Sequence, residues 1–362
     1  MRVGIDVSIL SAPLTGIGNF TLRLVCSLVG LKENAEWVLL GAPIGADGLP
    51  EGENVLVHPV AGLMGTRRVR WQQVELPRLA KQYGLQVLHC PDFSRPIGCR
   101  VPVVNTIHDL SYYVPESFFS LPSRYYKRLL TRTTVARSNR IVAVSNFTRE
   151  ELFRRFVIKK DKVAVIYHGI DPAPSGKAAE RNEPFVLYVG TLEERKNITT
   201  LVRAFGLLRS TRDAPLRLIL AGKPGRGFSK IKAEINRCPF KGNIEILGYV
   251  ERETVLELYR GAEAFILPSL YEGFGLPVLE AMALGTPVIC SRVAALPEIA
   301  DDAAGYFDPL NSEDLAATLA KILSSASLRA EMKRRGFERI KLFSWDKCAR
   351  RYYEVYQNAA GL

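Results

Sequence analysis

Glu272 and Glu280 are the two acidic side chains whose setting most clearly points to chemistry. They lie in the segment PSLYEGFGLPVLEAMALGTPVI, residues 268–289. An ionised carboxylate accepts two hydrogen bonds at once, which suits the neighbouring hydroxyls of a ribose or hexose. The pair alone would be a weak signal. It gains weight because an apolar run precedes the loop that holds Glu272, and the helix expected at residues 277–284 holds Glu280.

The start of that helix predicts an anion site. Pro277 suits the first turn of a helix, where its missing N–H has no cost. The backbone N–H groups of Phe274, Gly275 and Leu276 then lack partners within the helix and can point at a phosphate, which the helix dipole also favours. Glycine lets the backbone approach the phosphate closely.

Arg195 and Lys196 form the second candidate group, within FVLYVGTLEERKNITTLVRAF, residues 185–205. A strand is expected to end at Gly190, Thr191 follows it, and the two bases are expected to open the next helix. Cations at a helix N-terminus oppose its dipole, so their position suggests an anionic ligand such as a diphosphate. The alternative is a pair of exposed surface bases.

Two further groups follow apolar runs in the first half of the chain. Gly16 and Gly18, within SAPLTGIGNFTLRL (residues 11–24), resemble a phosphate cradle, although Thr21 stands where a full G-x-G-x-x-G would have its third glycine. A tight turn is the alternative. His108 and Asp109 end the run VVNTIHDL, where a ligand of a parallel sheet would bind. A structural histidine is the alternative there.

The sequence lacks the motifs of several other chemistries. No D-x-D pair occurs that could hold a divalent ion on a diphosphate, so Arg195, Lys196 and backbone amides would have to neutralise it, and we expect neither a metal nor another cofactor. H-E-x-x-H, G-x-S-x-G and the P-loop are also absent. None of the six cysteines forms a C-x-x-C pair, and reduced thiols are expected.

The elements that must position these residues are alternating strands and helices. Alternation of this kind predicts parallel sheets with helices on both faces, and continuous apolar runs fit strands that are buried on both sides. The expected strands are 3–7, 37–40, 55–59, 87–90, 101–107, 140–144 and 162–166, and then 185–190, 216–222, 244–247, 264–268 and 287–290.

The segment 171–184, DPAPSGKAAERNEP, interrupts this pattern and is the expected linker. It divides the chain into an N-terminal acceptor-side domain, 1–172, and a nucleotide-binding domain, 183–343. A helix at 344–362 is expected to return to the first domain. The predicted fold class is therefore α/β, with two Rossmann-like doubly wound domains that face each other across a cleft at the carboxyl ends of their strands.

The formal net charge of +12 is concentrated between Arg124 and Lys162, where 12 bases face 3 acids. The charge could mark a solvated helix face, or it could attract an anionic acceptor or membrane surface. Nucleic acid is not expected, because no RNP, zinc-finger or leucine-zipper pattern is present. No signal peptide or membrane span is apparent, so a cytoplasmic protein is expected, peripheral at the inner face of the membrane.

These features together resemble glycosyltransferase family 4, the retaining enzymes of the GT-B fold. The E-x(7)-E signature corresponds to Glu272 and Glu280, and the strings VGTLEERKNI, LHCPDFSRP, TIHDLSYYVPESF, VSNFTREEL, LGYV and FSWDKCARRYYEVY are similar to further family landmarks. One departure is Thr191, where many members carry an arginine after the glycine corresponding to Gly190. Arg195 is the expected substitute.

The resemblance implies a role for each candidate residue. Arg195 and Lys196 would bind the diphosphate as leaving group, and Glu280 would hold the ribose hydroxyls. Glu272 and the amides of Phe274, Gly275 and Leu276 would contact the donor sugar and phosphate. His108 would contact the sugar near the reacting carbon. Gly16 and Gly18 would bring the first loop to the phosphates or acceptor, and the backbone of Val250 would contact the base.

The resemblance favours GDP-mannose as donor and a glycan or lipid-linked saccharide as acceptor. A UDP-sugar such as UDP-glucose remains an alternative donor, and a sugar-nucleotide epimerase shares the architecture. An epimerase would need no acceptor, so an assay with donor and acceptor separates the two. A non-enzymatic basic binding module would leave Arg195, Lys196, Glu272 and Glu280 without a role.

Overall fold

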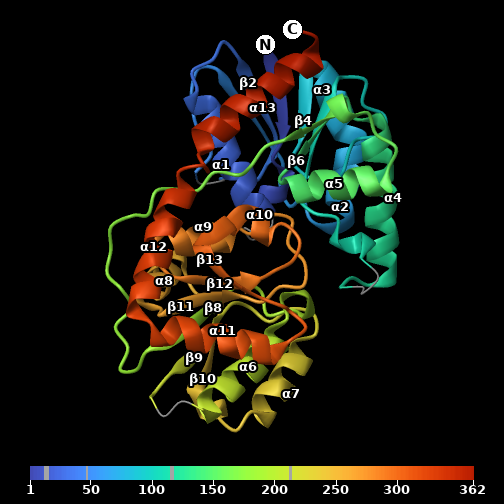
Figure 1. Ribbon diagram of the computed structural model, residues 1–362. Coiled ribbons are helices and arrows are strands. Elements are labelled where there is room, and N and C mark those ends of the chain that lie inside the picture. The colour runs from blue at the N-terminus through green and yellow to red at the C-terminus, as the bar shows by residue number, and fades with distance from the viewer. Residues whose placement is uncertain (12–15, 46–47, 115–117, 212–213) are drawn as a thin grey trace. The chain divides into compact units, whose positions relative to one another are not determined.

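The computed structural model describes residues 1–11, 16–45, 48–114, 118–211 and 214–362, and it divides into two compact α/β units (Figure 1). Unit 1 consists of Met1–Gly169 together with Phe343–Leu362, and unit 2 consists of Ile170–Leu342. Each unit contains one parallel sheet with helices packed on it. The predicted fold class, α/β with two doubly wound domains, is confirmed.

Unit 1 is built on a seven-stranded sheet in the order β3-β2-β1-β4-β5-β6-β7, in which every neighbouring pair is parallel. The central strands are buried along their whole length, as continuous apolar runs predict. The strands are β1 (Arg2–Asp6), β2 (Glu36–Ala42), β3 (Val55–Pro59), β4 (Val87–Cys90), β5 (Val103–Ile107), β6 (Arg140–Ala143) and β7 (Val163–Val165).

The helices of unit 1 include the last helix of the chain. Its cap is Ser344, whose hydroxyl accepts a hydrogen bond from the Lys347 N–H, and its tyrosines share one core with Phe20 and Trp37. The helices are α1 (Gly16–Gly30), α2 (Gly65–Arg70), α3 (Leu76–Gln82), α4 (Leu121–Arg137), α5 (Asn146–Arg155) and α13 (Trp345–Ala360), with the short turns η1 (Ser8–Ser11), η2 (Trp71–Glu75), η3 (Ser111–Tyr113) and η4 (Lys160–Lys162).

Unit 2 has a six-stranded sheet in the order β10-β9-β8-β11-β12-β13, which is again parallel throughout. The strands are β8 (Phe185–Val189), β9 (Arg217–Ala221), β10 (Ile244–Gly248), β11 (Ala264–Leu267), β12 (Val288–Ser291) and β13 (Ala304–Phe307). The last of these was not expected from the sequence, because AGYF is short and contains a glycine.

The helices of unit 2 cover its sheet. They are α6 (Ile198–Ser210), α7 (Phe228–Arg237), α8 (Arg252–Gly261), α9 (Leu276–Ala283), α10 (Leu296–Ala300), α11 (Ser312–Ser324) and α12 (Ala326–Ile340), with the short turns η5 (Glu194–Lys196), η6 (Lys241–Asn243) and η7 (Asp301–Ala303). Among all the described helices, none has both the length and the apolar composition that crossing a bilayer requires.

Each sheet has one point where the strand order reverses. In unit 1 it lies between β1 and β4, and in unit 2 between β8 and β11. Loops that leave two neighbouring strands in opposite directions open a crevice at their carboxyl ends, and open α/β sheets bind their ligands there. The loops that follow β8 and β11 hold most of the residues predicted to bind the donor.

Candidate active site

Lys196, Arg195 and Glu272 form one polar cluster at the strand-order reversal of unit 2. The Lys196 ammonium lies 2.5 Å from Oε1 of Glu272, and a guanidinium nitrogen of Arg195 lies 3.4 Å from Oε2. The hydroxyl of Ser269 donates to the same carboxylate at 2.6 Å. The loops after β8 and β11 therefore bring together two cations and the first glutamate of the predicted signature.

The loop after β8 holds the two cations differently from the sequence prediction. Arg195 and Lys196 do not open α6; they lie in the turn η5 that precedes it, and Asn197, with φ of 56°, reverses the backbone before the helix begins at Ile198. Their side chains are held by carboxylates, since Arg195 also contacts Glu193 at 2.9 Å. The helix dipole is therefore not the reason that they need an anionic partner.

Burial and charge act against each other in this cluster. Burial would raise the pKa of Glu272, but Lys196, Arg195 and the hydrogen bonds from Lys196 and Ser269 lower it to about 2. Burial lowers the pKa of Lys196, and the neighbouring Glu272 opposes that shift. Glu272 is therefore ionised at neutral pH. Two mostly buried cations held this closely are preorganised to receive further negative charge.

The turn before α9 depends on one glycine. Gly275 has φ of +111°, and a Cβ there would lie 2.8 Å from the Leu296 side chain. Pro277 occupies the first turn of α9, and the N–H of Ala295 donates to the Glu272 carbonyl, which ties the loop to the start of α10. The backbone at Phe274, Gly275 and Leu276 thus forms the N-terminus of α9, as predicted for an anion site.

Glu280 belongs to a separate ion pair on α9. A guanidinium nitrogen of Arg252, the first residue of α8, lies 3.0 Å from Oε1 of Glu280. Burial raises the pKa of Glu280 and Arg252 opposes that shift, while the charge of Asp171 adds to it. Val250 lies in the loop just before α8. The two glutamates of the signature therefore have different cationic partners within unit 2.

The loops after β8 and β9 approach each other through glycines. Gly190 has φ of +143° and Gly222 has φ of +156°, and a Cβ on Gly222 would lie 1.9 Å from the Gly190 carbonyl oxygen. Only glycine allows this approach. It fixes the path of Thr191, whose carbonyl accepts a hydrogen bond from the Tyr188 hydroxyl, and so the start of the loop that leads to Arg195.

His108 lies directly after β5 in unit 1, as predicted. Its Nε2 is 2.9 Å from the carbonyl oxygen of Pro91, so this nitrogen carries the proton and Nδ1 is left as an acceptor. Burial lowers its pKa, which keeps the ring neutral at neutral pH. The ring packs edge-on against Phe20 at 4.8 Å and against His168 at 5.4 Å. This environment suits a hydrogen-bond acceptor for a sugar hydroxyl.

Gly16 and Gly18 are the first and third residues of α1, so they open a helix, as expected. Residues 12–15, which complete the predicted glycine-containing loop, lie outside the described residues, as do residues 115–117 of the string that follows His108. Gly18 is buried and lies two residues before Phe20, the ring that contacts His108.

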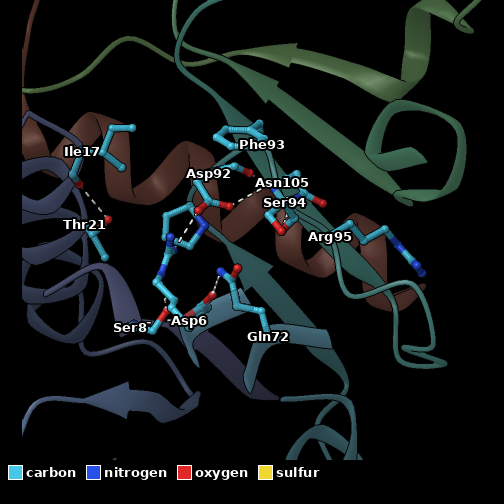
Figure 2. A network of polar contacts seen from close by, with 12 residues as sticks. Asp6, Ser8, Ile17, Thr21, Gln72, Asp92, Phe93, Ser94, Arg95 and Asn105 are labelled. Carbon is cyan, nitrogen blue, oxygen red and sulfur yellow. Dashed lines mark hydrogen bonds and ion pairs between the residues drawn. The ribbon is translucent and has the colours of Figure 1, made fainter. Parts of the chain in front are cut away.

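A polar network that the sequence did not suggest crosses the carboxyl ends of β1, β4 and β5 (Figure 2). Gln72 donates to Asp6 at 2.7 Å, and Arg68 donates to Ser8 and to Asp92, at 2.9 and 2.8 Å. The Asn105 side chain donates to the carbonyls of Asp92 and Ser94. The only sequence signal was the position of Asp6 and Asp92 at the ends of apolar runs. The network fixes the loop that carries Pro91, the partner of His108.

Comparison with known protein families covers both units. The profile described as Glycosyltransferase Family 4 matches residues 14–174, and the profile described as Glycosyl transferases group 1 matches residues 172–339. Among characterised proteins, the O-antigen chain mannosyltransferase B of Escherichia coli is 32% identical over 369 residues, which covers 95% of this chain and 96% of that protein.

Solved structures are similar along the whole chain. Sucrose-phosphate synthase from Thermosynechococcus elongatus has a TM-score of 0.79 at 20% identity, with 99% of this chain and 98% of that one covered. Anabaena HepE, solved in complex with UDP and glucose, has a TM-score of 0.72 at 16% identity, with 99% and 100% covered. At these identities the similarity concerns the fold alone.

Proposed function

Because this chain belongs to glycosyltransferase family 4 and is a hexosyltransferase, we propose that it transfers mannose from GDP-mannose, with retention, to a glycan or a lipid-linked saccharide. The donor and acceptor are the proposed part. The full-length similarity to an O-antigen chain mannosyltransferase supports them.

The observation that carries the proposal is the cluster of Lys196, Arg195 and Glu272. In the transfer, the bond between the anomeric carbon and a phosphate oxygen breaks, the acceptor oxygen bonds to that carbon, and its proton passes to the departing diphosphate, which lies on the same face of the sugar. Negative charge then develops on the departing diphosphate. Two cations that are already fixed and desolvated stabilise that charge without reorganising, so they act most strongly in the transition state.

Each remaining candidate has a chemical role consistent with its geometry. The carboxylate of Glu272, once its cations also contact phosphate, accepts hydrogen bonds from hydroxyls of the donor sugar. Glu280 accepts from the ribose hydroxyls, with the backbone of Val250 toward the base. His108, with Nδ1 as acceptor, receives a hydroxyl of the transferred sugar. The start of α9 donates backbone N–H groups to a phosphate.

A UDP-sugar is the alternative donor, and the fold accommodates one, since Anabaena HepE was solved with UDP and glucose. We further propose that the reaction needs no metal ion, because Arg195 and Lys196 supply the positive charge that a divalent ion would bring. The proposed site of action is the cytoplasm, at the inner face of the membrane, where a lipid-linked acceptor would be found.

The test is a comparison of donors. The melting temperature of the protein should rise more in the presence of GDP than in the presence of UDP, since a ligand that binds only the folded state stabilises that state. Release of the nucleotide diphosphate should then be measured from GDP-mannose and UDP-glucose, with and without saccharide acceptors. A larger shift with UDP, together with release only from UDP-glucose, would show that the donor is a UDP-sugar and not GDP-mannose. Conversion of the donor to an epimer in the absence of any acceptor would show that the protein is an epimerase and not a transferase.

A further inference from the structure

Helix α4 presents a row of large apolar side chains to solvent. Leu121, Tyr125 and Leu129 are 64%, 70% and 63% exposed, and Tyr126 beside them is 39% exposed. Residues four apart lie on one face of a helix, so the first three form a continuous row along α4. Single exposed apolar residues need no explanation, but a row of them on one helix marks a surface that contacts something.

The same helix carries only positive charge. Between Leu121 and Arg137 it has the bases Arg124, Lys127, Arg128, Arg132 and Arg137 and no acidic residue. Arg132 and Arg137 are exposed, while Arg124 and Arg128 are folded against the carbonyl of Tyr112 at the edge of the helix. Apolar side chains with arginines on and beside their row are the composition of a helix that lies in a membrane interface.

The opposite side of α4 is firmly packed. The Lys127 ammonium lies 4.1 Å from the centre of the Phe119 ring and within 6 Å of Phe93 and Tyr112. The Lys162 ammonium donates to the carbonyls of Val135 and Ala136 near the C-terminal end of α4, which brings the turn η4 beside the helix. The exposed row therefore lies on a helix whose other side is packed against unit 1; Figure 1 shows the course of α4.

We propose that this row docks unit 1 on an anionic lipid bilayer. Leu121 and Leu129 would enter the boundary between headgroups and acyl chains, the tyrosine rings would lie at headgroup level, and the arginines would contact lipid phosphates. A lipid-linked acceptor would reside in a membrane, and this row gives the chain a defined surface for that membrane. The link to the acceptor rests on the proposed function; the docking surface does not.

Charge decides between this occupant and the others. A second copy of the chain would bring another helix with five bases and no acid against this one, and like charges at an interface are unfavourable. A nucleic acid would match the arginines but would leave the leucines in water. An anionic bilayer satisfies both sets of side chains at once.

The experiment measures sedimentation of the full chain with vesicles of phosphatidylcholine alone and of phosphatidylcholine mixed with phosphatidylglycerol, at low and high salt. The wild type should bind the mixed vesicles, with weaker binding at high salt because exposed charges are screened. The double variant Leu121→Ser, Leu129→Ser should bind them on the order of tenfold more weakly. The matched control is Leu310→Ser, since Leu310 is 84% exposed in unit 2.

A second pair of variants tests the charge. Arg132→Gln with Arg137→Gln should weaken binding by about fivefold for each base removed. Lys232→Gln with Arg237→Gln removes the same charge from exposed positions of α7 in unit 2 and should leave binding nearly unchanged. If both charge pairs reduce binding equally, net charge rather than α4 attracts the vesicles, and the proposal is wrong.

Other outcomes are equally decisive. Equal binding to both vesicle types, no binding at low salt, or full binding of the leucine variant would overturn the proposal. A wild-type dimer that the leucine variant converts to a monomer, measured by light scattering, would assign the row to a second copy instead. The shift in melting temperature caused by GDP should be the same in all variants. Its absence from the wild type, with vesicle binding intact, would refute the proposed function and leave the docking surface standing.

Discussion

The ammonium of Lys196 and the carboxylate of Glu272 lie 2.5 Å apart, although 76 residues separate them in the chain. Both side chains are mostly buried, with exposed fractions of 13% and 12%. A buried ion pair compensates the cost of desolvating each charge, and removing one partner leaves the other uncompensated. The pair therefore holds the Lys196 ammonium, which we propose binds the diphosphate, in place before any ligand arrives.

Replacement of Lys196 by alanine should lower kcat/KM, because the developing charge on the diphosphate loses a fixed cation. The lost transition-state stabilisation should be about 2–4 kcal/mol. Steady-state kinetics with the donor established by the binding screen measure this. Lys241→Ala, which removes an exposed base from the same unit, is the control and should behave as the wild type. Turnover of Lys196→Ala at the wild-type rate would refute the role.

The two signature glutamates should respond differently to substitution. Glu280→Gln should weaken the affinity for the nucleotide diphosphate, since Glu280 is proposed to hold the ribose. Glu272→Gln should lower turnover more than nucleotide affinity, since Glu272 is proposed to act on the sugar. Calorimetric Kd values and kcat for both variants separate the roles. Equal loss of nucleotide affinity in the two variants would contradict the division.

Nucleotide binding should weaken as the pH falls, and the loss should occur at a pH above the ordinary pKa of a glutamate. Burial raises the pKa of Glu280, and only its ionised form accepts two ribose hydrogen bonds, so affinity is present above that pKa and is lost as the pH falls through it. Arg252 opposes the shift, so Arg252→Ala should move the loss to higher pH. Titration of Kd against pH measures this.

The control for the pH experiment is another arginine of the same helix. Arg260 donates to the carbonyl of Lys177 rather than to Glu280, so Arg260→Ala should keep the wild-type midpoint. If Arg252→Ala weakens binding equally at every pH, Arg252 acts on the nucleotide directly and not through the ionisation of Glu280.

Transfer should persist in excess chelator. Arg195 and Lys196 are proposed to supply the charge that a divalent ion would otherwise place on the diphosphate. The measurement is donor turnover before and after addition of EDTA, and after later addition of magnesium or manganese. Loss of activity in EDTA, followed by recovery with either ion, would show that the cations do not suffice.

Helix α13 should contribute strongly to the stability of unit 1. Tyr352 is fully buried and its hydroxyl lies 2.8 Å from Oγ1 of Thr106, so Tyr352→Ala should cost about 3–5 kcal/mol of unfolding free energy. Tyr352→Phe should cost about 1 kcal/mol, because only a hydrogen bond is lost. Urea unfolding measures both. Tyr249→Ala, at a position 73% exposed, is the control and should change stability little.

Local sequence patterns were sufficient for most of the strands. Residues 55–59 and 87–90 were expected as strands and form β3 and β4 over the same residues, because their apolar character is strong. The strand β13 was missed. AGYF is short and contains a glycine, so it does not stand out as a strand in the sequence.

By itself, the sequence determined which residue types stand at the carboxyl ends of strands, and hence that Arg195, Lys196, Glu272, Glu280 and His108 were the candidates. Side-chain chemistry and strand periodicity are local properties, so they can be read without coordinates. Only the tertiary structure decided the pairings: Lys196 with Glu272, and Arg252 with Glu280. These follow from the order in which the strands join the sheet, which places distant loops side by side. They also depend on burial, which sets how strongly each charge needs its partner.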